Sequence, residues 1–333
     1  MPTDAEHTAP PAALEELAGT KVVVTGGSGF IGGHVVAALC RLGARVVSVD
    51  RRPAPAFRCH PDGQHGVEVV HGDLREPEVV AAAVGPGTSA VVHLAAQTQV
   101  LRSVEDPQGT FENNVLVTHY LLERCREMGV GAFVLASTNA VVGSGASGTL
   151  REGVPLGPLT PYGATKAADE MLLSCYSSVY GVRGVALRFT NVYGPGMSEK
   201  DSIVPRLMRT AASGGTFEVY GDGLQVRDYV NVADVAAAVL LGLAQPGLRG
   251  PLVIGSGRSV SVMDVVAVVE QSMGAKLNVH HGPAKAGEMP AVVVDNSLAR
   301  SWGWVPAVSL EQGVAQVVEE WGYKDGAGRA QPA

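Results

Sequence analysis

The chain has 333 residues, of which 46% are apolar, and a formal net charge of −7. This length and apolar content suffice for one large core or two smaller ones. The acidic balance argues against nucleic acid or an anionic membrane as a partner, because neither would be attracted at a distance. No apolar run approaches the ~18 residues of a membrane span. Residues 1–17 lack the basic start and apolar centre of a signal peptide, so we expect a cytoplasmic protein.

The first predicted strand and helix meet in a glycine-rich turn. Residues 22–24 form an apolar run, and the segment 25–32 that follows contains Gly26, Gly29 and Gly32. Gly26 would permit a tight turn, Gly29 would let the backbone approach a pyrophosphate, and Gly32 would let the helix pack closely. Free N–H groups at the start of that helix would bind the phosphates. The motif is weak alone, but its position between a strand and a helix predicts a dinucleotide site.

The second predicted strand, residues 45–49, ends at Asp50, which lies 18 residues beyond Gly32. A carboxylate at this point accepts hydrogen bonds from the adenosine ribose and repels a 2′-phosphate, which favours NAD over NADP. Arg51 and Arg52 leave NADP open, since an arginine just after this strand can bind a 2′-phosphate.

Short β-branched runs then alternate with Ala- and Leu-rich stretches, which predicts an α/β fold with a doubly wound parallel (Rossmann) sheet. These runs are residues 22–24, 37–42, 46–49, 79–84, 91–94, 116–128 and 133–136. After residues 185–189 glycine-rich loops predict a second, smaller substrate-binding lobe. The predicted domains are a flexible N-terminus (1–18), an NAD-binding domain (19–190) to which the chain returns around 226–254, a substrate lobe (mainly 191–324) and a flexible tail (325–333).

Tyr162 and Lys166 lie four residues apart after Pro161, a common first residue of a helix, so one helical face would carry both side chains. A nearby ammonium and a nicotinamide ring would favour the phenolate of Tyr162, which could then take a proton from a sugar hydroxyl. Thr138 ends the predicted strand 133–138 and offers a hydroxyl to the same oxygen. Taken alone, the Tyr/Lys pair is equally compatible with an ordinary amphipathic helix.

Several separated motifs occur together in the chain. They are the turn at 25–32, Asp50, residues 72–74, 93–96 and 113–115, Ser137 with Thr138, Tyr162 with Lys166, and residues 191–195 and 221–228. On these motifs the chain resembles the extended short-chain dehydrogenase/reductase family from about residue 21 to 321, and within it the nucleotide-sugar epimerases and dehydratases. The resemblance implies an enzyme that uses NAD and binds a UDP-sugar or another NDP-sugar, and a homodimer formed through helices near residues 104–126 and 162–180.

The motifs and the resemblance imply a role for each site residue. Thr138, Tyr162 and Lys166 would be catalytic. The cofactor would contact Gly26, Gly29, Phe30, Ile31, Gly32, Asp50, Arg51, Asp73, Leu74, Leu94, Ala95, Ala96, Asn113, Tyr162 and Lys166. The substrate would contact Gln97, Thr138, Asn139, Asn191, Val204, Tyr220, Arg227, Lys285 and Glu288. No metal site is expected, because Cys59, His60, His65 and His71 are irregularly spaced in a Pro/Gly-rich loop.

Departures from the family pattern reduce the number of reactions that this chain is expected to catalyse. The family's dehydratases place Asp-Glu after the catalytic threonine, whereas this chain has Asn139 and Ala140, so 4,6-dehydration is not expected and decarboxylation of UDP-glucuronate is less favoured. Val142 replaces a usual tyrosine, and Lys285 replaces a usual arginine that forks onto a diphosphate. Both changes bear on substrate identity more than on reaction type.

We therefore predict an NAD-dependent NDP-sugar 4-epimerase, which oxidises C4 transiently and returns the hydride to either face. UDP-glucose/UDP-galactose is the first choice of substrate, because residues 96–107 resemble the corresponding loop of UDP-galactose 4-epimerases. UDP-glucuronate and UDP-N-acetylhexosamine are alternative substrates. An NAD(P)-dependent nucleotide-sugar ketoreductase or dehydrogenase is an alternative enzyme, and a non-catalytic NAD-sensing regulator is an alternative from another class.

Overall fold

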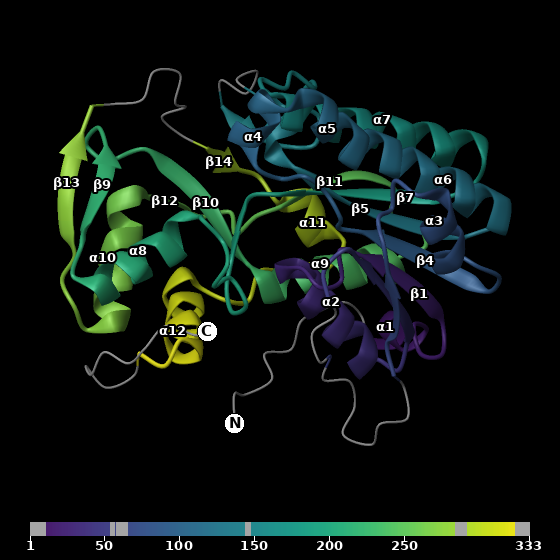
Figure 1. Ribbon diagram of the computed structural model, residues 1–333, viewed down its shortest axis with the longest axis horizontal. Helices are drawn as coiled ribbons and strands as arrows, with labels where there is room; N and C mark the ends of the chain where they lie inside the picture. The colour runs from purple at the N-terminus through teal and green to yellow at the C-terminus, as the bar shows by residue number, and fades with distance from the viewer. Residues whose placement is uncertain (1–10, 54–56, 58–65, 144–147, 284–291, 324–333) are drawn as a thin grey trace.

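The computed structural model describes residues 11–53, 57, 66–143, 148–283 and 292–323. A large domain with a central sheet covered by helices occupies the right of Figure 1, and a smaller lobe lies to its left. In the described part of the chain, no helix is both long and apolar enough to span a bilayer.

The central sheet has seven strands in the order β11-β7-β5-β4-β1-β2-β3. All of its strand pairs are parallel. The strands are β1 (Lys21–Thr25), β2 (Arg45–Asp50), β3 (Glu68–His71), β4 (Thr88–His93), β5 (Ala132–Thr138), β7 (Arg183–Phe189) and β11 (Gly250–Ile254). The order reverses beside β1, where β2 lies on one side and β4 on the other. This confirms the predicted doubly wound sheet, whose ligands bind at the carboxyl edge near such a reversal.

Both faces of the sheet are buried, and the alternation along each strand assigns side chains to one face or the other. Val22 and Val24 of β1 belong to one core cluster, whereas Val23 belongs to a second cluster on the opposite face. The first core contains α2 (Phe30–Arg41) and α9 (Val232–Ala244); the second contains α3 (Pro77–Ala83), α6 (Val117–Met128) and α7 (Pro161–Val179). Burial on both faces explains why the strands are almost continuously apolar.

Short elements complete the outer layer. Helices α4 (Val100–Glu105) and α5 (Pro107–Phe111) lie against α7, and a π-helical turn, η1 (Glu112–Leu116), leads into α6. A short 3₁₀ turn, η2 (Asn139–Val141), follows β5, and α11 (Ser297–Ser301) packs against β11.

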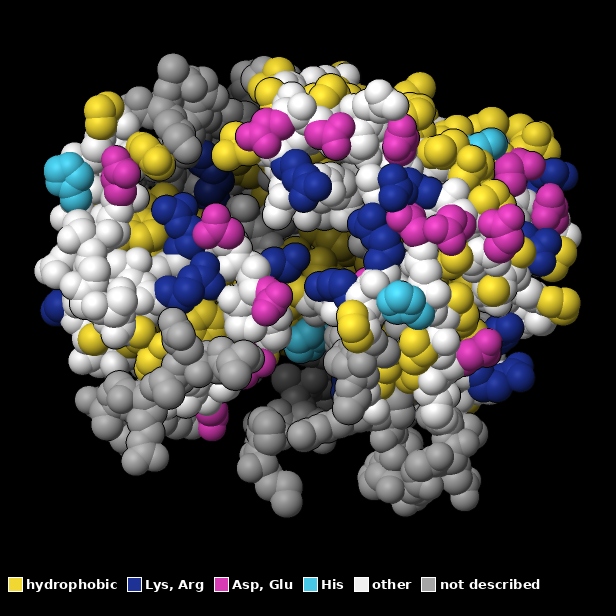
Figure 2. Space-filling model, viewed as in Figure 1, with side chains coloured by type: hydrophobic (Ala, Val, Ile, Leu, Met, Phe, Trp, Pro, Cys, Tyr) yellow, Lys and Arg dark blue, Asp and Glu magenta, His cyan; other side chains and the backbone are white. Residues whose placement is uncertain are grey.

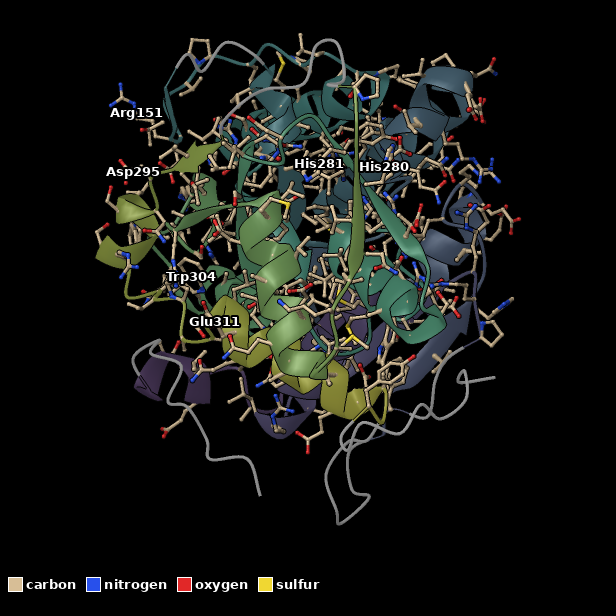
Figure 3. All side chains as sticks on the ribbon, turned by 90° about the vertical axis from the view of Figure 1, so that its left-hand side faces the viewer. Arg151, His280, His281, Asp295, Trp304 and Glu311 are labelled. Carbon is tan, nitrogen blue, oxygen red and sulfur yellow. The ribbon has the colours of Figure 1, made fainter. Side chains whose placement is uncertain are left out.

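The smaller lobe has a core of its own, formed by α8 (Ile203–Ser213), α10 (Val262–Met273) and α12 (Leu310–Glu320) with the neighbouring strands. Its sheets are β8 (Asn191–Tyr193), β10 (Val226–Asn231) and β12 (Ser259–Ser261), and the pair β9 (Thr216–Tyr220) with β13 (Asn278–Gly282). Figure 3 looks onto this lobe, with His280 and His281 on β13. Strand β14 (Val293–Val294) pairs with β6 (Thr149–Leu150).

One boundary of the predicted flexible N-terminus needs correction. Residues 11–18 were predicted to be flexible, but they contain helix α1 (Pro11–Glu15), and Leu17 is 7% exposed in the core beside α2 and α9. Leu14 packs against the same core. The Ala-, Pro- and acid-rich composition of this segment obscured two leucines three residues apart, which bury one face of the chain. Residues 325–333 lie outside the described part of the chain.

Candidate active site

A cavity of about 300 Å³ opens at the carboxyl ends of β1, β2, β3 and β4. All the predicted cofactor contacts except Tyr162 and Lys166 line it: Gly26, Gly29, Phe30, Ile31, Gly32, Asp50, Arg51, Asp73, Leu74, Leu94, Ala95, Ala96 and Asn113. Figure 2 shows the molecule hollowed between its two lobes, with lysine and arginine side chains around the hollow. Residues far apart in the sequence thus meet at the edge of the sheet where doubly wound folds bind nucleotides.

The glycine turn has no room for side chains. Gly26 has a φ of +71°, and a Cβ there would lie 2.9 Å from the nitrogen of Ala95. A Cβ on Gly32 would lie 2.1 Å from the carbonyl oxygen of Gly26. Gly29 is the N-cap of α2, and no side chain caps that helix. The turn therefore leaves the first N–H groups of α2 directed at the cavity, where they can bind an anion.

Asp50 is held at the end of β2 by its neighbours. Its Oδ2 accepts a hydrogen bond from the backbone N–H of Ser28 at 3.1 Å, and its Oδ1 accepts one from the N–H of Arg52 at 2.9 Å. The guanidinium Nε of Arg52 lies 3.4 Å from Oδ1. These contacts fix the carboxylate at the cavity wall, where it can accept hydrogen bonds from ribose hydroxyls.

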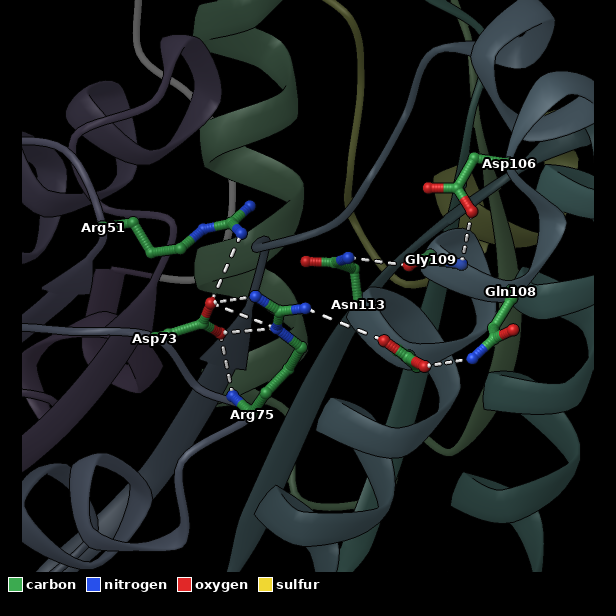
Figure 4. A network of polar contacts seen from close by, with 8 residues as sticks. Arg51, Asp73, Arg75, Asp106, Gln108, Gly109 and Asn113 are labelled. Atoms are coloured by element: carbon green, nitrogen blue, oxygen red, sulfur yellow. Dashed lines mark hydrogen bonds and ion pairs between the residues drawn. The ribbon is translucent and has the colours of Figure 1, made fainter.

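Asp73 lies at the centre of a polar network beside the cavity (Figure 4). Arg75 Nη2 lies 2.7 Å from Asp73 Oδ2, and Arg51 Nη1 lies 3.5 Å from the same oxygen. The hydrogen bond from Arg75 lowers the pKa of Asp73 to about 2, against the opposing effect of burial. Asp73 is therefore ionised at neutral pH and remains a hydrogen-bond acceptor for the predicted contact with the cofactor.

Lys200 also lines this cavity, although it belongs to the smaller lobe. Its Nζ lies 5.9 Å from the ring centroid of Phe30, and Arg209 donates a hydrogen bond to its carbonyl oxygen at 3.0 Å. Burial, together with the charge of Arg52, lowers the pKa of Lys200. No carboxylate pairs with Lys200 among the described residues, so its ammonium is available to a bound diphosphate.

The predicted catalytic residues meet where β5 ends and α7 begins. Thr160 caps α7 by accepting a hydrogen bond from the N–H of Gly163 at 3.2 Å, and Pro161 is the first residue of the helix. This start places Tyr162 beside Thr138, the last residue of β5, and the two side chains are hydrogen-bonded. A phenol and an aliphatic hydroxyl are thus adjacent at the carboxyl edge of the sheet.

Without NAD, the surroundings of Tyr162 favour its protonated form. Burial raises the pKa of Tyr162 to about 12; the hydrogen bond with Thr138 lowers it, and the charge of Asp169 raises it further. Lys166 donates a hydrogen bond to Asp169 at 3.2 Å, and both side chains are buried. These shifts describe the protein without NAD, so the expected activation of Tyr162, which includes the charge of the nicotinamide ring, stays a prediction. The spacing of Tyr162 and Lys166 contained no information on desolvation or on a counter-ion.

Asn114 connects the two halves of the site and was not among the predicted site residues. It is completely buried on the π-helical turn η1, a kind of turn that is frequent at functional sites. Its Nδ2 donates to the hydroxyl of Thr165 at 2.9 Å, and its Oδ1 accepts from the N–H of Gln97 at 2.8 Å. Asn114 thus ties the loop after β4 to the helix that carries Tyr162. Its signal in the sequence was its place beside Asn113 in the motif.

A second cavity, of about 270 Å³, lies in the smaller lobe. Three of the predicted substrate residues, Asn191, Val204 and Arg227, line it together with Tyr193, Gln225 and Tyr229. Asn191 donates a hydrogen bond to the carbonyl oxygen of Asp228 at 2.9 Å. The wall therefore offers a cation, amides and aromatic rings, which suit the diphosphate and base of a nucleotide.

The other predicted substrate residues lie outside this cavity wall. Gln97, Thr138 and Asn139 lie at the edge of the large sheet, where Thr138 donates to Asn139 Oδ1 at 3.3 Å. Tyr220 ends β9, and its carbonyl oxygen accepts a hydrogen bond from Gln225 at 3.2 Å. Lys285 and Glu288 fall outside the described residues.

The described residues contain no group of three or more His, Cys, Asp or Glu side chains arranged to hold a metal ion. Of the irregular cluster noted in the sequence, Cys59, His60 and His65 lie outside the described part of the chain, and His71 ends β3.

A Rossmann sheet with a glycine turn, an acidic residue after β2, and a tyrosine beside a threonine at the sheet edge defines a dinucleotide-dependent enzyme. The model of the NAD dependent epimerase/dehydratase family matches residues 22–255. The chain belongs to this family and is an NAD-dependent nucleotide-sugar epimerase or dehydratase. The expected cofactor, NAD, and the family predicted from the sequence are confirmed.

Similar proteins agree on this class. The UDP-glucose 4-epimerase of Azospirillum brasilense is 30% identical over 327 residues, which cover 92% of this chain and 93% of the relative. The UDP-glucose 4-epimerase of Thermus thermophilus, solved with NAD, is 34% identical with a TM-score of 0.80, covering 90% of this chain and 98% of that one. MoeE5, solved with UDP-glucuronic acid and NAD, is 35% identical with a TM-score of 0.80 and the same coverage of both chains.

Proposed function

We propose that this protein is an NAD-dependent 4-epimerase of UDP-sugars, with UDP-glucose and UDP-galactose as its substrate pair. The observation that carries the proposal is the pairing of Tyr162 with Thr138, followed directly by Asn139 and Ala140. A 4,6-dehydratase needs acid and base groups to remove water from C5 and C6 after C4 is oxidised. Neither Asn139 nor Ala140 carries an ionisable group, so the site supports chemistry at C4 only.

The proposed reaction moves one proton and one hydride and ends with no net oxidation. Bound NAD supplies a hydride acceptor that becomes the hydride donor for the return step. Tyr162 removes the proton of the C4 hydroxyl while that carbon loses its hydride, and it returns the proton after the ketosugar has presented its other face. Thr138 hydrogen-bonds the same sugar oxygen and keeps it within reach of Tyr162.

Rotation of the 4-ketosugar in the site requires that the nucleotide is bound tightly and that the sugar ring has few fixed contacts. Arg227 and Asn191 in the wall of the second cavity support a nucleotide site in the smaller lobe. An arginine suits a diphosphate because its planar fork donates two parallel hydrogen bonds. The chemistry would then occur at the edge of the large sheet while the smaller lobe holds UDP.

The experiment that tests this proposal uses the purified protein without added cofactor. It is incubated separately with UDP-glucose, UDP-N-acetylglucosamine and UDP-glucuronate, and the products are identified by proton NMR. We expect the C4 epimer of UDP-glucose to form, which would demonstrate both the reaction and retained NAD. If every sugar were recovered unchanged even after NAD was added, the proposal would fail. Net formation of NADH together with a stable ketosugar would favour the dehydrogenase alternative instead.

UDP-glucuronate is the second candidate substrate, because MoeE5 was solved with UDP-glucuronic acid at 35% identity to this chain. The same NMR assay separates the candidates by comparing kcat/KM for the two sugars. A higher kcat/KM for UDP-glucuronate would move the assignment to that sugar without changing the reaction type.

We also propose that the chain forms a homodimer through the outer helices of the large domain. Apolar side chains of these helices are exposed, among them Leu101 and Val104 on α4, Phe111 on α5, and Met171 and Val179 on α7. Neighbouring exposed apolar residues of this kind are typical of interaction surfaces. Light scattering is expected to give the molar mass of two chains, and a mass of one chain would contradict the proposal.

A further inference from the structure

Asp169 lies on α7 three residues after Lys166, and the two side chains form a buried ion pair. Lys166 Nζ lies 3.2 Å from Asp169 Oδ2, and the side chains are 2% and 0% exposed. The other carboxylate oxygen, Oδ1, is buried and accepts no hydrogen bond within the described part of the chain. A hydrogen bond from the Thr118 side chain on α6 also acts on this carboxylate and lowers its pKa. One carboxylate oxygen still remains buried without a hydrogen bond, which costs free energy and calls for a role other than stability.

We propose that Asp169 is a positioning residue of this site: its carboxylate holds the Lys166 ammonium and limits how much of that positive charge acts on Tyr162. The inference rests on the proposed role of Tyr162 as the proton acceptor. It assigns a function to a residue outside the Tyr162–Lys166 motif. An ammonium has more than one N–H donor, so Lys166 can keep this contact and still bind a ribose hydroxyl.

The other titratable groups next to the Lys166–Asp169 pair are either paired or uncharged. On α7, the next carboxylate, Glu170, is paired with Arg188 of β7 at 2.7 Å. Toward β4 lies His93, whose Nδ1 is 2.7 Å from Thr25 Oγ1 and whose Nε2 is 3.1 Å from Thr118 Oγ1 of α6.

Burial, then the charge of Lys166, lowers the pKa of His93 well below its usual value, so this imidazole is neutral at neutral pH. Among these neighbours, Asp169 is therefore the charge that acts on Tyr162, and Lys166 is its counter-ion.

The effects on proton affinity have a definite sign. Burial raises the pKa of Asp169, and the charge of Lys166 opposes that shift. The Asp169 charge in turn raises the pKa of Tyr162. Removing the negative charge while keeping the shape should therefore lower the pKa of Tyr162, because the carboxylate charge that raises it is gone.

The test compares Asp169→Asn with the unchanged protein by ultraviolet difference titration of the Tyr162 phenolate, both saturated with NAD. Each spectrum is corrected with the same protein carrying Tyr162→Phe, since the chain has 8 tyrosines. We expect Asp169→Asn to lower the apparent pKa of Tyr162 by about one unit, a roughly tenfold larger phenolate fraction at a pH below the pKa. An unchanged or raised pKa would overturn the proposal.

Two further variants keep the result interpretable. Asp169→Glu retains the charge and should leave the Tyr162 pKa near its original value, whereas Asp169→Ser removes the charge from a smaller side chain and serves if Asp169→Asn does not fold. Glu127→Gln is the matched control, because Glu127 is an exposed acid on α6 whose partner is Arg124. A shift in Glu127→Gln equal to that in Asp169→Asn would contradict a specific role for Asp169.

The titration needs no sugar, so its result is independent of the proposed substrate. If the phenolate shift occurs but no UDP-sugar is converted, the proposed function fails and the positioning role stands. If the sugars are converted, the rising limb of the plot of kcat/KM against pH should move to lower pH in Asp169→Asn, because the unprotonated base is then present at lower pH. Converted sugars with an unmoved limb would overturn the positioning role alone.

Discussion

Substitution of Tyr162 by phenylalanine is expected to lower the turnover number for UDP-sugar epimerisation by roughly 10²–10⁴-fold, the range typical of a lost general acid or base. Phenylalanine keeps the aromatic ring near the start of α7 but removes the oxygen that is proposed to accept the sugar proton. The NAD content of the purified protein should change little, because the cavity that holds most predicted cofactor contacts does not include Tyr162 in its wall. Turnover is measured by NMR and NAD content by absorbance after denaturation.

Tyr180→Phe is the matched control for that substitution. Tyr180 follows the last residue of α7, is exposed, and lies beneath the guanidinium of Arg126 at 5.5 Å. The same loss of a phenolic oxygen there should leave turnover unchanged. Near-normal turnover of Tyr162→Phe would refute the assignment of Tyr162 as the base, and an equal loss in both variants would point to a general effect on the helix.

The parts of the fold that follow from local chain geometry were predicted well. Three glycines between an apolar run and a helix predicted the turn, and the structure explains each of them: the +71° φ of Gly26, the uncapped helix start at Gly29, and the 2.1 Å approach at Gly32. The same logic applies to Asp50, because parallel strands bring their carboxyl ends to one edge. A residue at the end of a strand can therefore be assigned to that edge from sequence alone.

The parts that depend on tertiary packing could not be predicted in this way. Lys200 reaches the dinucleotide cavity from the smaller lobe, and only the arrangement of the lobes brings it to Phe30. Asn114 faces inward between elements that are distant in the chain, so its neighbours in the sequence carry no sign of its partners Thr165 and Gln97. The partner of Asp169, Lys166, is only three residues away, but the sequence does not show that the pair is buried. Burial also depends on tertiary packing. It raises the pKa of Tyr162, and the spacing of the motif gives no information on how buried this side chain is.

The catalytic helix is anchored to the sheet by a second buried ion pair. Glu170 on α7 accepts hydrogen bonds from Arg188 of β7, with Nη2–Oε2 at 2.7 Å and Nε–Oε1 at 3.0 Å, and from the hydroxyl of Ser137 on β5. Arg188 also donates to the carbonyl oxygen of Glu152 at 3.1 Å. The pair therefore fixes α7, and with it Tyr162, against two strands of the sheet.

Arg188→Met is expected to lower the free energy of unfolding by about 3–5 kcal/mol, because it leaves the Glu170 carboxylate buried without a counter-charge. The side chains of Arg188 and Glu170 are only 5% and 8% exposed, so water cannot replace the lost partner. The measurement is urea unfolding extrapolated linearly to water, with every variant at the same NAD concentration because bound NAD itself stabilises the native state.

Two comparisons distinguish the effect of the unpaired Glu170 charge on stability from the effect of losing the arginine side chain. In Arg188→Met/Glu170→Gln both charges are gone, so most of the lost stability should return, since the destabilisation comes from the uncompensated carboxylate. Arg258→Met breaks an exposed pair with Glu311, 3.6 Å apart, and should cost no more than ~1 kcal/mol. If Arg188→Met cost as little as Arg258→Met, the Glu170–Arg188 pair would not be the anchor of the catalytic helix. If the double variant were as unstable as Arg188→Met, the packing of the arginine side chain would be responsible rather than its charge.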